Sequence, residues 1–251
     1  MFKILLRKAV SFTNRIKGYN YDVPNKNGEY DLLNKVLKLK NQVVFDVGAN
    51  IGEYASRVLS INNTTNLHCF EPVSATFNEL KTTMELHFPD SKVHLNHFGM
   101  SNSISQLEIF VYGNTAGINS LYLNEKYIHL RKGSEEKLVK ELISLKTLDR
   151  YLEDAKIKHI DFLKIDTEGH DSMCLLGGVN ALQNGRIKAI QFEYNNYWKI
   201  PGYKLKDTID LLHDNNYELY RLTFWGKIKI RKYSNTLENY LSANYYAVYR
   251  E

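Results

Sequence analysis

Several features are scarce in this sequence, and each scarcity excludes a class of protein. It has only four prolines and no Gly/Ser-rich stretch, so no interdomain linker is predicted. No apolar run is long enough to cross a bilayer, and no internal repeat indicates a solenoid. With 251 residues and 43% apolar side chains, the composition is typical of one globular domain. We therefore predict a single domain over residues 41–251, preceded by a helical extension over residues 1–40.

Cysteine and net charge are equally limited. Cys69 and Cys174 are the only cysteines, and each lies in an apolar stretch, which favours core packing in a reducing compartment over a disulfide. No group of cysteines and histidines has the spacing of a zinc site. Lys and Arg total 33 against 28 Asp and Glu, and a net charge of +5 is too small to indicate a nucleic-acid partner.

The first nineteen residues have a pattern of their own. Apolar side chains recur at three- and four-residue steps, as on one face of a helix, and no acid occurs before Asp22. Arg7 and Lys8 interrupt the apolar segment that a secretory signal needs. We predict an amphipathic helix packed on the domain, with a transit peptide or contact with an anionic membrane surface as alternatives. The predicted location is cytoplasmic, and peripheral at the membrane if the last alternative holds.

From residue 43 onward, short β-rich runs alternate with helical patterns, which is typical of a doubly wound, mostly parallel sheet. The predicted strands of this part are Val43–Val47, Leu67–Phe70, Val93–Phe98, Ile160–Ile165 and Ile187–Phe192. The predicted helices are Tyr54–Ser60, Ala75–His87, Asp171–Leu182 and Leu205–Asp214. The last strands, Tyr217–Phe224, Ile228–Arg231 and Tyr245–Tyr249, have no helix between them and predict an antiparallel close. Residues 102–145 break the alternation and predict an inserted hairpin over one end of the sheet.

One short segment says most about the ligand. Asp46-Val-Gly48-Ala-Asn50-Ile-Gly52 follows a predicted buried strand and opens a predicted helix. Gly48 allows a tight turn, Gly52 allows a close approach of helix to strand, and a helix N-terminus favours a carboxylate or phosphate. The ligand is therefore predicted at this edge of the sheet.

Glu71 completes the pattern. It ends the second predicted strand, where a carboxylate accepts hydrogen bonds from both ribose hydroxyls of an adenosine-type cofactor. Dinucleotide enzymes carry a glycine where this chain has Asn50, which counts against NAD. Asp46, just before the loop, can bind the ammonium group that S-adenosylmethionine carries and NAD lacks. We predict S-adenosylmethionine; the alternative without a ligand is that Asp46 and Glu71 cap strand-end turns.

Four motifs, DVGANIG, FEP, SLKTLD and DFLKIDTEGHD, resemble in their order the FkbM family of S-adenosylmethionine-dependent O-methyltransferases. The resemblance runs from about Val43 to the end of the chain. It implies a Rossmann-like class I methyltransferase fold with a seven-stranded sheet and an antiparallel C-terminal strand. It implies methylation of hydroxyl groups, in glycan biosynthesis or on small natural products. The predicted cofactor-binding residues are then Asp46, Gly48, Asn50, Gly52, Glu71, Pro72 and Ser101.

Methylation of a hydroxyl predicts a base, because a sugar hydroxyl is weakly acidic and loses its proton during attack. The candidates follow two neighbouring strands and are Asp166, Glu168, His170 and Glu193. His170 has the side chain whose ordinary pKa lies nearest neutrality, and Asp166 can orient it or act as the base itself. The sequence does not decide among them. The alternative without chemistry is that Asp166 caps a helix and His170 is an exposed loop residue.

Two further features concern the acceptor end. Asp166, Glu193 and Asn195 resemble the oxygen ligands that catechol-type O-methyltransferases use for Mg²⁺, although we assign no metal-binding residue and keep the ion as an alternative. Tyr197 and Trp198 are flanked by polar residues and are predicted to bind substrate, because ring faces suit the C–H face of a sugar.

The preferred function is O-methylation of a carbohydrate hydroxyl. Methylation of a small secondary metabolite would use the same residues. An NAD-dependent oxidoreductase and a non-catalytic cofactor-binding partner are less favoured, because Asn50 replaces a dinucleotide glycine and because Asp166 and His170 are both present. We expect no nucleic-acid partner, and the sequence does not predict an oligomeric state.

Overall fold

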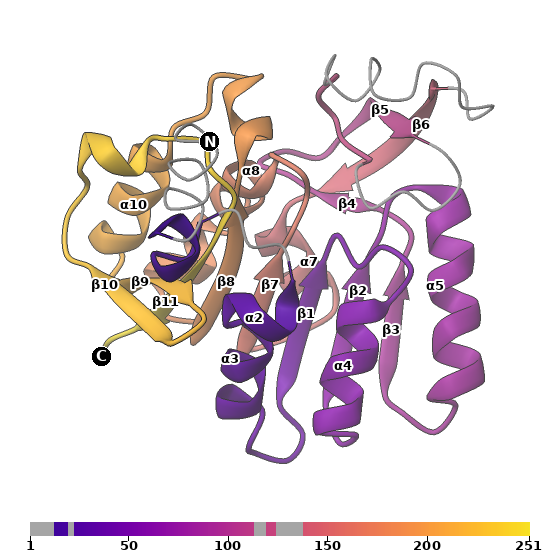
Figure 1. Ribbon diagram of the computed structural model, residues 1–251. Helices are drawn as coiled ribbons and strands as arrows, with labels where there is room; N and C mark the ends of the chain where they lie inside the picture. The colour runs from indigo at the N-terminus through magenta and orange to yellow at the C-terminus, as the bar shows by residue number, and fades with distance from the viewer. Residues whose placement is uncertain (1–12, 20–22, 113–118, 124–137) are drawn as a thin grey trace, which may run out of the picture.

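The computed structural model describes residues 13–19, 23–112, 119–123 and 138–251. Its centre is an eight-stranded sheet in the order β10-β9-β11-β8-β7-β1-β2-β3 (Figure 1). The strands are β1 (Val43–Val47), β2 (Asn66–Phe70), β3 (Val93–Asn96), β7 (Phe162–Ile165), β8 (Ala189–Tyr194), β9 (Tyr217–Thr223), β10 (Gly226–Ile230) and β11 (Ala243–Tyr249). The sheet has one strand more than the seven expected.

The direction of each strand sets where a ligand can bind. Strands β8, β7, β1, β2 and β3 pair in parallel, whereas β11 pairs antiparallel with both β8 and β9. The carboxyl ends of β1, β2, β7 and β8 therefore meet at one edge, where ligands bind in doubly wound sheets. The mostly parallel sheet with an antiparallel C-terminal strand is confirmed.

Each face of the sheet has its own hydrophobic core. One core packs α3 (Glu29–Val36), α4 (Glu53–Ile61) and α5 (Ser74–His87) on the sheet through residues such as Leu33, Val58 and Leu80. The other packs α7 (Leu148–Asp154), α8 (Asp171–Leu176), α9 (Val179–Gln183) and α10 (Leu205–Asp214) on the opposite face. In α10, Leu205, Ile209 and Leu212 share one buried face, as the 3.6-residue period requires. No described helix is both long and apolar enough to cross a membrane.

The helix predicted over Asp171–Leu182 is instead two short helices, α8 and α9. A Cβ on Gly177 would lie 2.0 Å from the carbonyl oxygen of Ser101, and one on Gly178 would lie 2.7 Å from Leu148 Cδ2. The glycine pair therefore lets the chain approach these neighbours closely at the cost of helix continuity. Helix α7 is not among the predicted elements, whereas α3 and the short α2 (Pro24–Asn27) lie within the helical extension predicted over residues 1–40.

The predicted insertion is confirmed as a hairpin. Strands β5 (Ser105–Tyr112) and β6 (Leu138–Lys146) pair antiparallel, and β4 (Gly99–Met100) joins β6 to make a three-stranded sheet. Figure 1 shows this small sheet above the upper edge of the central one. Its inner face packs Ile109, Ile143 and Leu145 against Val73, which follows β2. The insertion thus covers the β2 end of the ligand-binding edge.

Candidate active site

The glycine loop is bent back onto the neighbouring strands. Gly48 has φ +82°, and a Cβ there would lie 1.9 Å from the carbonyl oxygen of Asp166, so only glycine fits. Asn50 also has a positive φ, and its N–H donates to Glu71 Oε2 at 3.0 Å. Gly52 does not line the cavity described below; its missing Cβ makes room for Leu80 and Met84 of α5. Gly52 therefore serves helix packing, and its contact with the cofactor stays a prediction.

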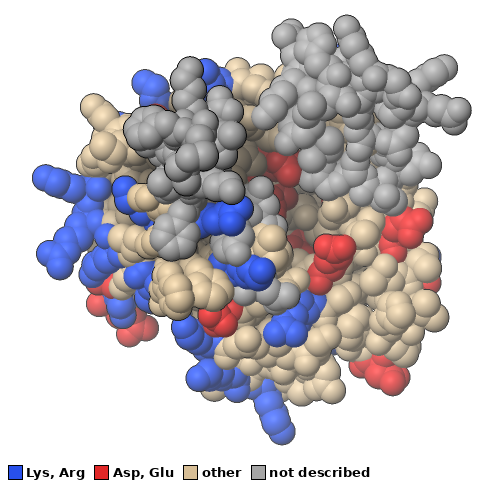
Figure 2. All heavy atoms as spheres, in the orientation of Figure 1, with Lys and Arg blue, Asp and Glu red and all other residues tan. Residues whose placement is uncertain are grey.

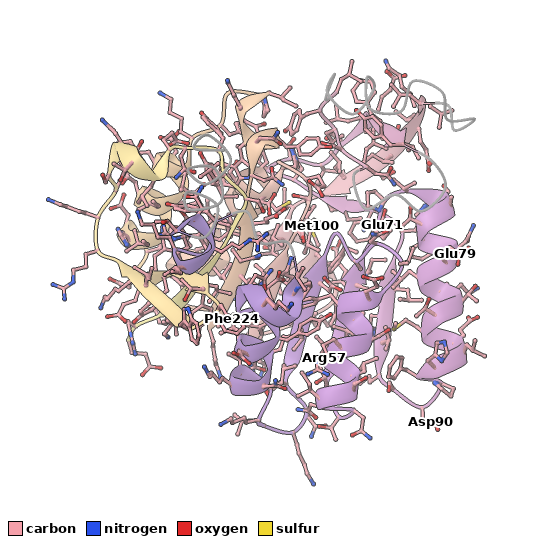
Figure 3. The ribbon with its side chains drawn as sticks, viewed as in Figure 1. Arg57, Glu71, Glu79, Asp90, Met100 and Phe224 are labelled. Atoms are coloured by element: carbon pink, nitrogen blue, oxygen red, sulfur yellow. The ribbon has the colours of Figure 1, made fainter. Side chains whose placement is uncertain are left out.

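Glu71 is held by the backbone. Its two carboxylate oxygens accept hydrogen bonds from the N–H groups of Asn50 and Val73, each at 3.0 Å. Burial raises the pKa of this carboxyl group to about 7, although both N–H groups stabilise the charged form. Glu71 and Met100 lie at the upper end of the sheet, beneath the insertion (Figure 3). The carboxylate is fixed in place before any ligand arrives.

Asp46 is a buried acid with a free acceptor. Asp46 lies in β1 and is 2% exposed. Its Oδ2 atom has no hydrogen-bond partner among the described residues. Burial raises its pKa to about 7, while the nearby ammonium of Lys164 lowers it. A buried acceptor without a hydrogen bond lowers the stability of a protein, so we expect a ligand to donate a hydrogen bond to this atom.

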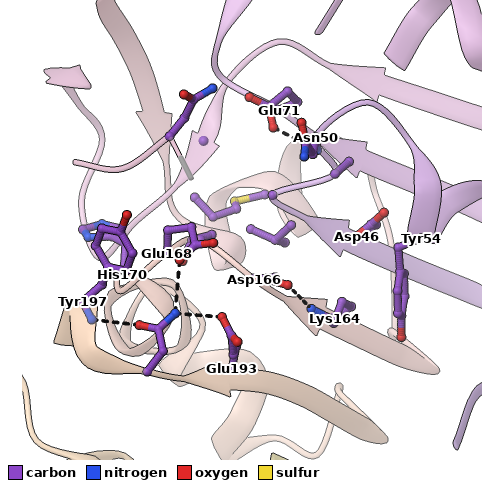
Figure 4. Close-up of a pocket in the computed structure, with 18 of the residues that line it drawn as sticks. Asp46, Asn50, Tyr54, Glu71, Lys164, Asp166, Glu168, His170, Glu193 and Tyr197 are labelled. Atoms are coloured by element: carbon purple, nitrogen blue, oxygen red, sulfur yellow. Dashed lines mark hydrogen bonds and ion pairs between the residues drawn. The ribbon is translucent and has the colours of Figure 1, made fainter. Parts of the chain in front are cut away.

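One cavity of about 710 Å³ connects these acids with the predicted reaction site. Of the predicted residues, it is lined by Asp46, Gly48, Asn50, Glu71, Pro72, Asp166, Glu168, His170, Glu193 and Tyr197 (Figure 4). The described structure thus brings together the predicted cofactor-binding and catalytic groups.

A buried lysine occupies the floor of this cavity. Lys164 lies in β7 opposite Asp46 of β1, is 2% exposed, and places Nζ 2.8 Å from Asp166 Oδ2. Burial opposes its charge, but the carboxylates of Asp166 and Glu29 outweigh burial and raise its pKa overall. No role for Lys164 is predicted from the sequence, although a single charged residue inside the buried strand FLKI is a signal that could have found it.

Glu168 and Glu193 face one another across the amide of Asn195. The Nδ2 atom of Asn195 donates to Glu168 Oε2 at 3.1 Å and to Glu193 Oε2 at 2.8 Å. Burial and the repulsion from Asp166 raise the pKa of both glutamates well above the ordinary value. Glu193 Oε1 also accepts from Ser242, whereas Glu168 Oε1 has no hydrogen bond to a described residue. Glu168 is therefore the freer carboxylate.

The metal alternative changes its ligand set. Oxygen atoms of Asp166, Glu168 and Glu193 lie within 4.8 Å of one another, close enough for one cation. The Oδ1 atom of Asn195, the predicted third oxygen ligand, already accepts the N–H of Tyr197, and its amino group faces the glutamates. The position of the Tyr197 N–H fixes this orientation of the amide.

His170 is held between two hydroxyl groups. The hydroxyl oxygen of Tyr122 lies 2.6 Å from Nδ1 of the imidazole, and that of Ser101 lies 3.0 Å from Nε2. Burial lowers the pKa of the imidazole to about 4, so the ring is neutral at physiological pH. Ser101 does not line the main cavity, and its contact with the cofactor stays a prediction. The contacts of Tyr122 and Ser101 with His170 fix the loop after β7. In this loop, Glu168 has the strained φ of +50°.

Only one of the two aromatic residues predicted to bind substrate lines the cavity. Tyr197 follows β8 and lines the cavity. Trp198 is fully buried, and its indole N–H donates to the backbone oxygen of Glu193. Trp198 therefore positions the strand end and does not bind substrate, which corrects that prediction.

Polar residues outside the predicted set close the cavity floor. Glu29 of α3 accepts hydrogen bonds from Gln191 at 2.8 Å and from Asn244 at 3.0 Å. Tyr54 donates its hydroxyl to the same Gln191 at 3.1 Å and places its ring 5.3 Å from Lys164 Nζ. These contacts join the N-terminal segment to both β8 and β11, a long-range association that sequence spacing does not reveal.

Residues 46–219 match the model of the methyltransferase FkbM domain. The chain belongs to the FkbM methyltransferase family. It is 24% identical over 180 residues to the hexuronic acid methyltransferase AglP of Haloferax volcanii, a match that covers 70% of this chain and 67% of AglP.

Two solved structures are similar to this chain. The N-terminal domain of human METTL16, in complex with SAH, matches with a TM-score of 0.50 and 8% identity over 92% of this chain and 72% of that one. A SAM-dependent methyltransferase from Agrobacterium tumefaciens has a TM-score of 0.46 and 8% identity over 91% of this chain and 62% of that one. The family model thereby confirms the predicted family and the methyltransferase class, and the METTL16 domain supports the predicted fold.

Proposed function

We propose that this family member transfers a methyl group from S-adenosylmethionine to a hydroxyl group of a carbohydrate. The observation that carries the proposal is the single cavity that joins Asp46 and Glu71 to the glutamate pair Glu168 and Glu193. Methyl transfer needs both halves, because donor and acceptor must be aligned in one line.

The cofactor half fits the group by charge and by shape. Asp46 Oδ2, a buried atom with no hydrogen-bond partner among the described residues, would bind the ammonium group, and Glu71 would accept hydrogen bonds from the ribose hydroxyls. Pro72 and the apolar side chains Ile143 and Leu145 of the insertion would flank the adenine ring. When bound, S-adenosylmethionine supplies an electrophilic methyl group. The carboxylates around it favour its positive charge.

In the acceptor half, we assign the base to Glu168. Its raised pKa makes it a stronger proton acceptor than an ordinary carboxylate, and its Oε1 has no hydrogen bond to a described residue. Glu193 is tied by Ser242 and Asn195, so it orients and tunes Glu168. His170 has a lowered pKa and hydroxyl groups on both ring nitrogens, which makes it a positioning residue.

The acceptor class rests on the walls of that half. Tyr30 and Tyr240 line this half with aromatic rings and Asn196 with an exposed amide, a mixture that suits a polar ring with C–H faces. AglP, by its name, acts on a hexuronic acid. A carbohydrate acceptor in glycan biosynthesis is therefore favoured over a small secondary metabolite. We also keep the division at residue 40 and the cytoplasmic location as proposals.

The test is an assay of methyl transfer from labelled S-adenosylmethionine to a panel of sugar glycosides and nucleotide-linked sugars. We expect label in a sugar product, located at one hydroxyl by mass spectrometry, and loss of product in Glu168→Gln. Methyl transfer to phenolic or polyketide-type hydroxyls, with none to any sugar, would assign the chain to small-metabolite methylation instead.

A further inference from the structure

Two large aromatic side chains project from a tight turn at the edge of the sheet. Phe224 and Trp225 connect β9 to β10, and their side chains pack on one another with ring centroids 4.6 Å apart. Trp225 is 77% exposed and Phe224 is 43% exposed. Because large apolar groups are costly in water, such a pair at a hairpin tip points to a contact with another surface.

The N-terminal segment packs beside this turn. A Cβ on Gly18 would lie 2.0 Å from the carbonyl oxygen of Leu222, and one on Gly28 would lie 2.7 Å from that of Thr223. The guanidinium of Arg221 donates to the carbonyl oxygen of Lys17 at 2.7 Å. Residues 13–19 and 23–28 are therefore fixed against the end of β9, next to Phe224 (Figure 3).

Together these segments form what we call the hairpin-tip surface. Its exposed apolar side chains are Ile16, Val23, Phe224 and Trp225, and its exposed cations are Arg15, Lys17, Lys26 and Lys227. Residues 13–19, 23–28 and 224–232 contain no Asp or Glu. Lysine and arginine side chains gather on this side of the molecule in Figure 2.

We propose that the hairpin-tip surface binds an anionic lipid bilayer. Exposed aromatic rings insert at the level of the headgroups, and lysines and arginines around them are attracted to anionic lipids. A second copy of this chain is a poor occupant, because two copies of a surface with a net positive charge repel one another. An acidic polysaccharide would bind the cations but would leave the Trp225 ring in water.

The position of the surface is consistent with such a role. Strand β9 runs in the same direction as β8, since both pair antiparallel with β11, so the hairpin tip lies at the ligand-binding edge of the sheet. Pro24 and Asn27 of the adjoining segment line the main cavity. The proposed membrane contact thus lies beside the cavity, and it stands independently of which acceptor is methylated.

The two tryptophans of the chain make a direct test available. Trp198 is fully buried, so a change in the fluorescence of the full chain on adding vesicles reports on Trp225. With vesicles of phosphatidylcholine and phosphatidylglycerol in equal parts, we expect a blue-shifted emission and quenching by brominated lipid. Both changes should be absent in Trp225→Phe and with phosphatidylcholine alone. Vesicle binding without a change in Trp225 would overturn the proposal, as would no binding.

Variants with matched controls give the size of each contribution. We expect Trp225→Ser to lower the vesicle partition coefficient about tenfold, whereas Leu86→Ser, which changes a similarly exposed apolar residue on α5, should have no effect. Lys17→Glu with Lys227→Glu should lower it about 30-fold or more, and added salt should weaken the wild type likewise. The control pair Lys92→Glu and Lys158→Glu changes the net charge equally at the opposite edge. Equal losses in both pairs, or binding of soluble polysaccharide but not of vesicles, would contradict a lipid contact at this surface.

Discussion

The two ends of the cavity are built in different ways. At the Glu71 end, the acid is held by backbone N–H groups, and apolar side chains of the insertion form the wall. At the Glu193 end, the polar groups are held by other side chains, contributed by α3, α4, β7, β8 and the segment before β11. At the first end the backbone fixes the position of the acid. At the second end the position of each polar side chain depends on the side chains that it contacts.

This difference separates binding from turnover. A carboxylate fixed by the backbone keeps its place when a side chain nearby is changed, so it acts on the affinity for the cofactor alone. Glu168 and Glu193 are coupled through Asn195 and repelled by Asp166, so their protonation responds to what is bound beside them. Changes at the two ends should therefore move different quantities.

The largest effect is expected at the Glu193 end. Glu168→Gln removes the proposed base while it keeps the size of the side chain, so the turnover number should fall about 100-fold to 1000-fold. The dissociation constant of S-adenosylmethionine, measured by titration calorimetry, should stay within about threefold of the wild type. A loss of cofactor affinity as large as the loss of turnover would show that the two ends are not separate.

The converse experiment changes the acid at the Glu71 end of the cavity. Glu71→Ala removes the acceptor of the ribose hydroxyls and leaves two buried N–H groups unpaired, so the affinity for S-adenosylmethionine should fall about 30-fold. Turnover at saturating cofactor should change little. Glu79→Ala, an exposed acid on α5, is the matched control and should bind as the wild type does. Unchanged affinity in Glu71→Ala would remove the carboxylate from the cofactor site.

The same contrast explains what the sequence could predict. Strand–helix alternation predicted the sheet, and the spacing of Asp46, Gly48 and Glu71 located the Glu71 end, because these residues follow adjacent strands. The motif DFLKIDTEGHD also pointed to Asp166 and Glu168, and both line the cavity. Local patterns suffice where chain neighbours form the site.

The rest depended on contacts between distant segments. Glu29 lies 162 positions before Gln191, and no period or motif connects the two. Trp198 was assigned to substrate because sequence position does not show the direction in which a side chain points. The boundary at residue 40 remains a prediction, although Tyr19 and Leu33 of the predicted extension pack in the cores of the domain.

A smaller effect is expected for His170. In His170→Asn, the hydrogen bonds to Tyr122 and Ser101 are weakened, so the loop that carries Glu168 loosens and turnover should fall about tenfold at most. The pH at which activity rises should not move, because the imidazole is already neutral. A shifted pH profile, or a loss as deep as that of Glu168→Gln, would make His170 the base.

The smallest effect concerns protons released at the cofactor end. Burial raises the pKa of Asp46 and of Glu71 to about 7, so each is half protonated at neutral pH in the free protein. An ammonium group beside Asp46 and donors beside Glu71 favour the charged forms, so binding lowers both pKa values and releases about one proton at pH 7. Affinity should therefore rise as the pH rises through 7, by about threefold between pH 7 and pH 8. Calorimetry in two buffers of different ionisation enthalpy measures the release, and Asp46→Asn should remove about half of it. Because Glu168 lies at the other end, Glu168→Gln should release as many protons as the wild type, and any deficit would measure the coupling between the two ends.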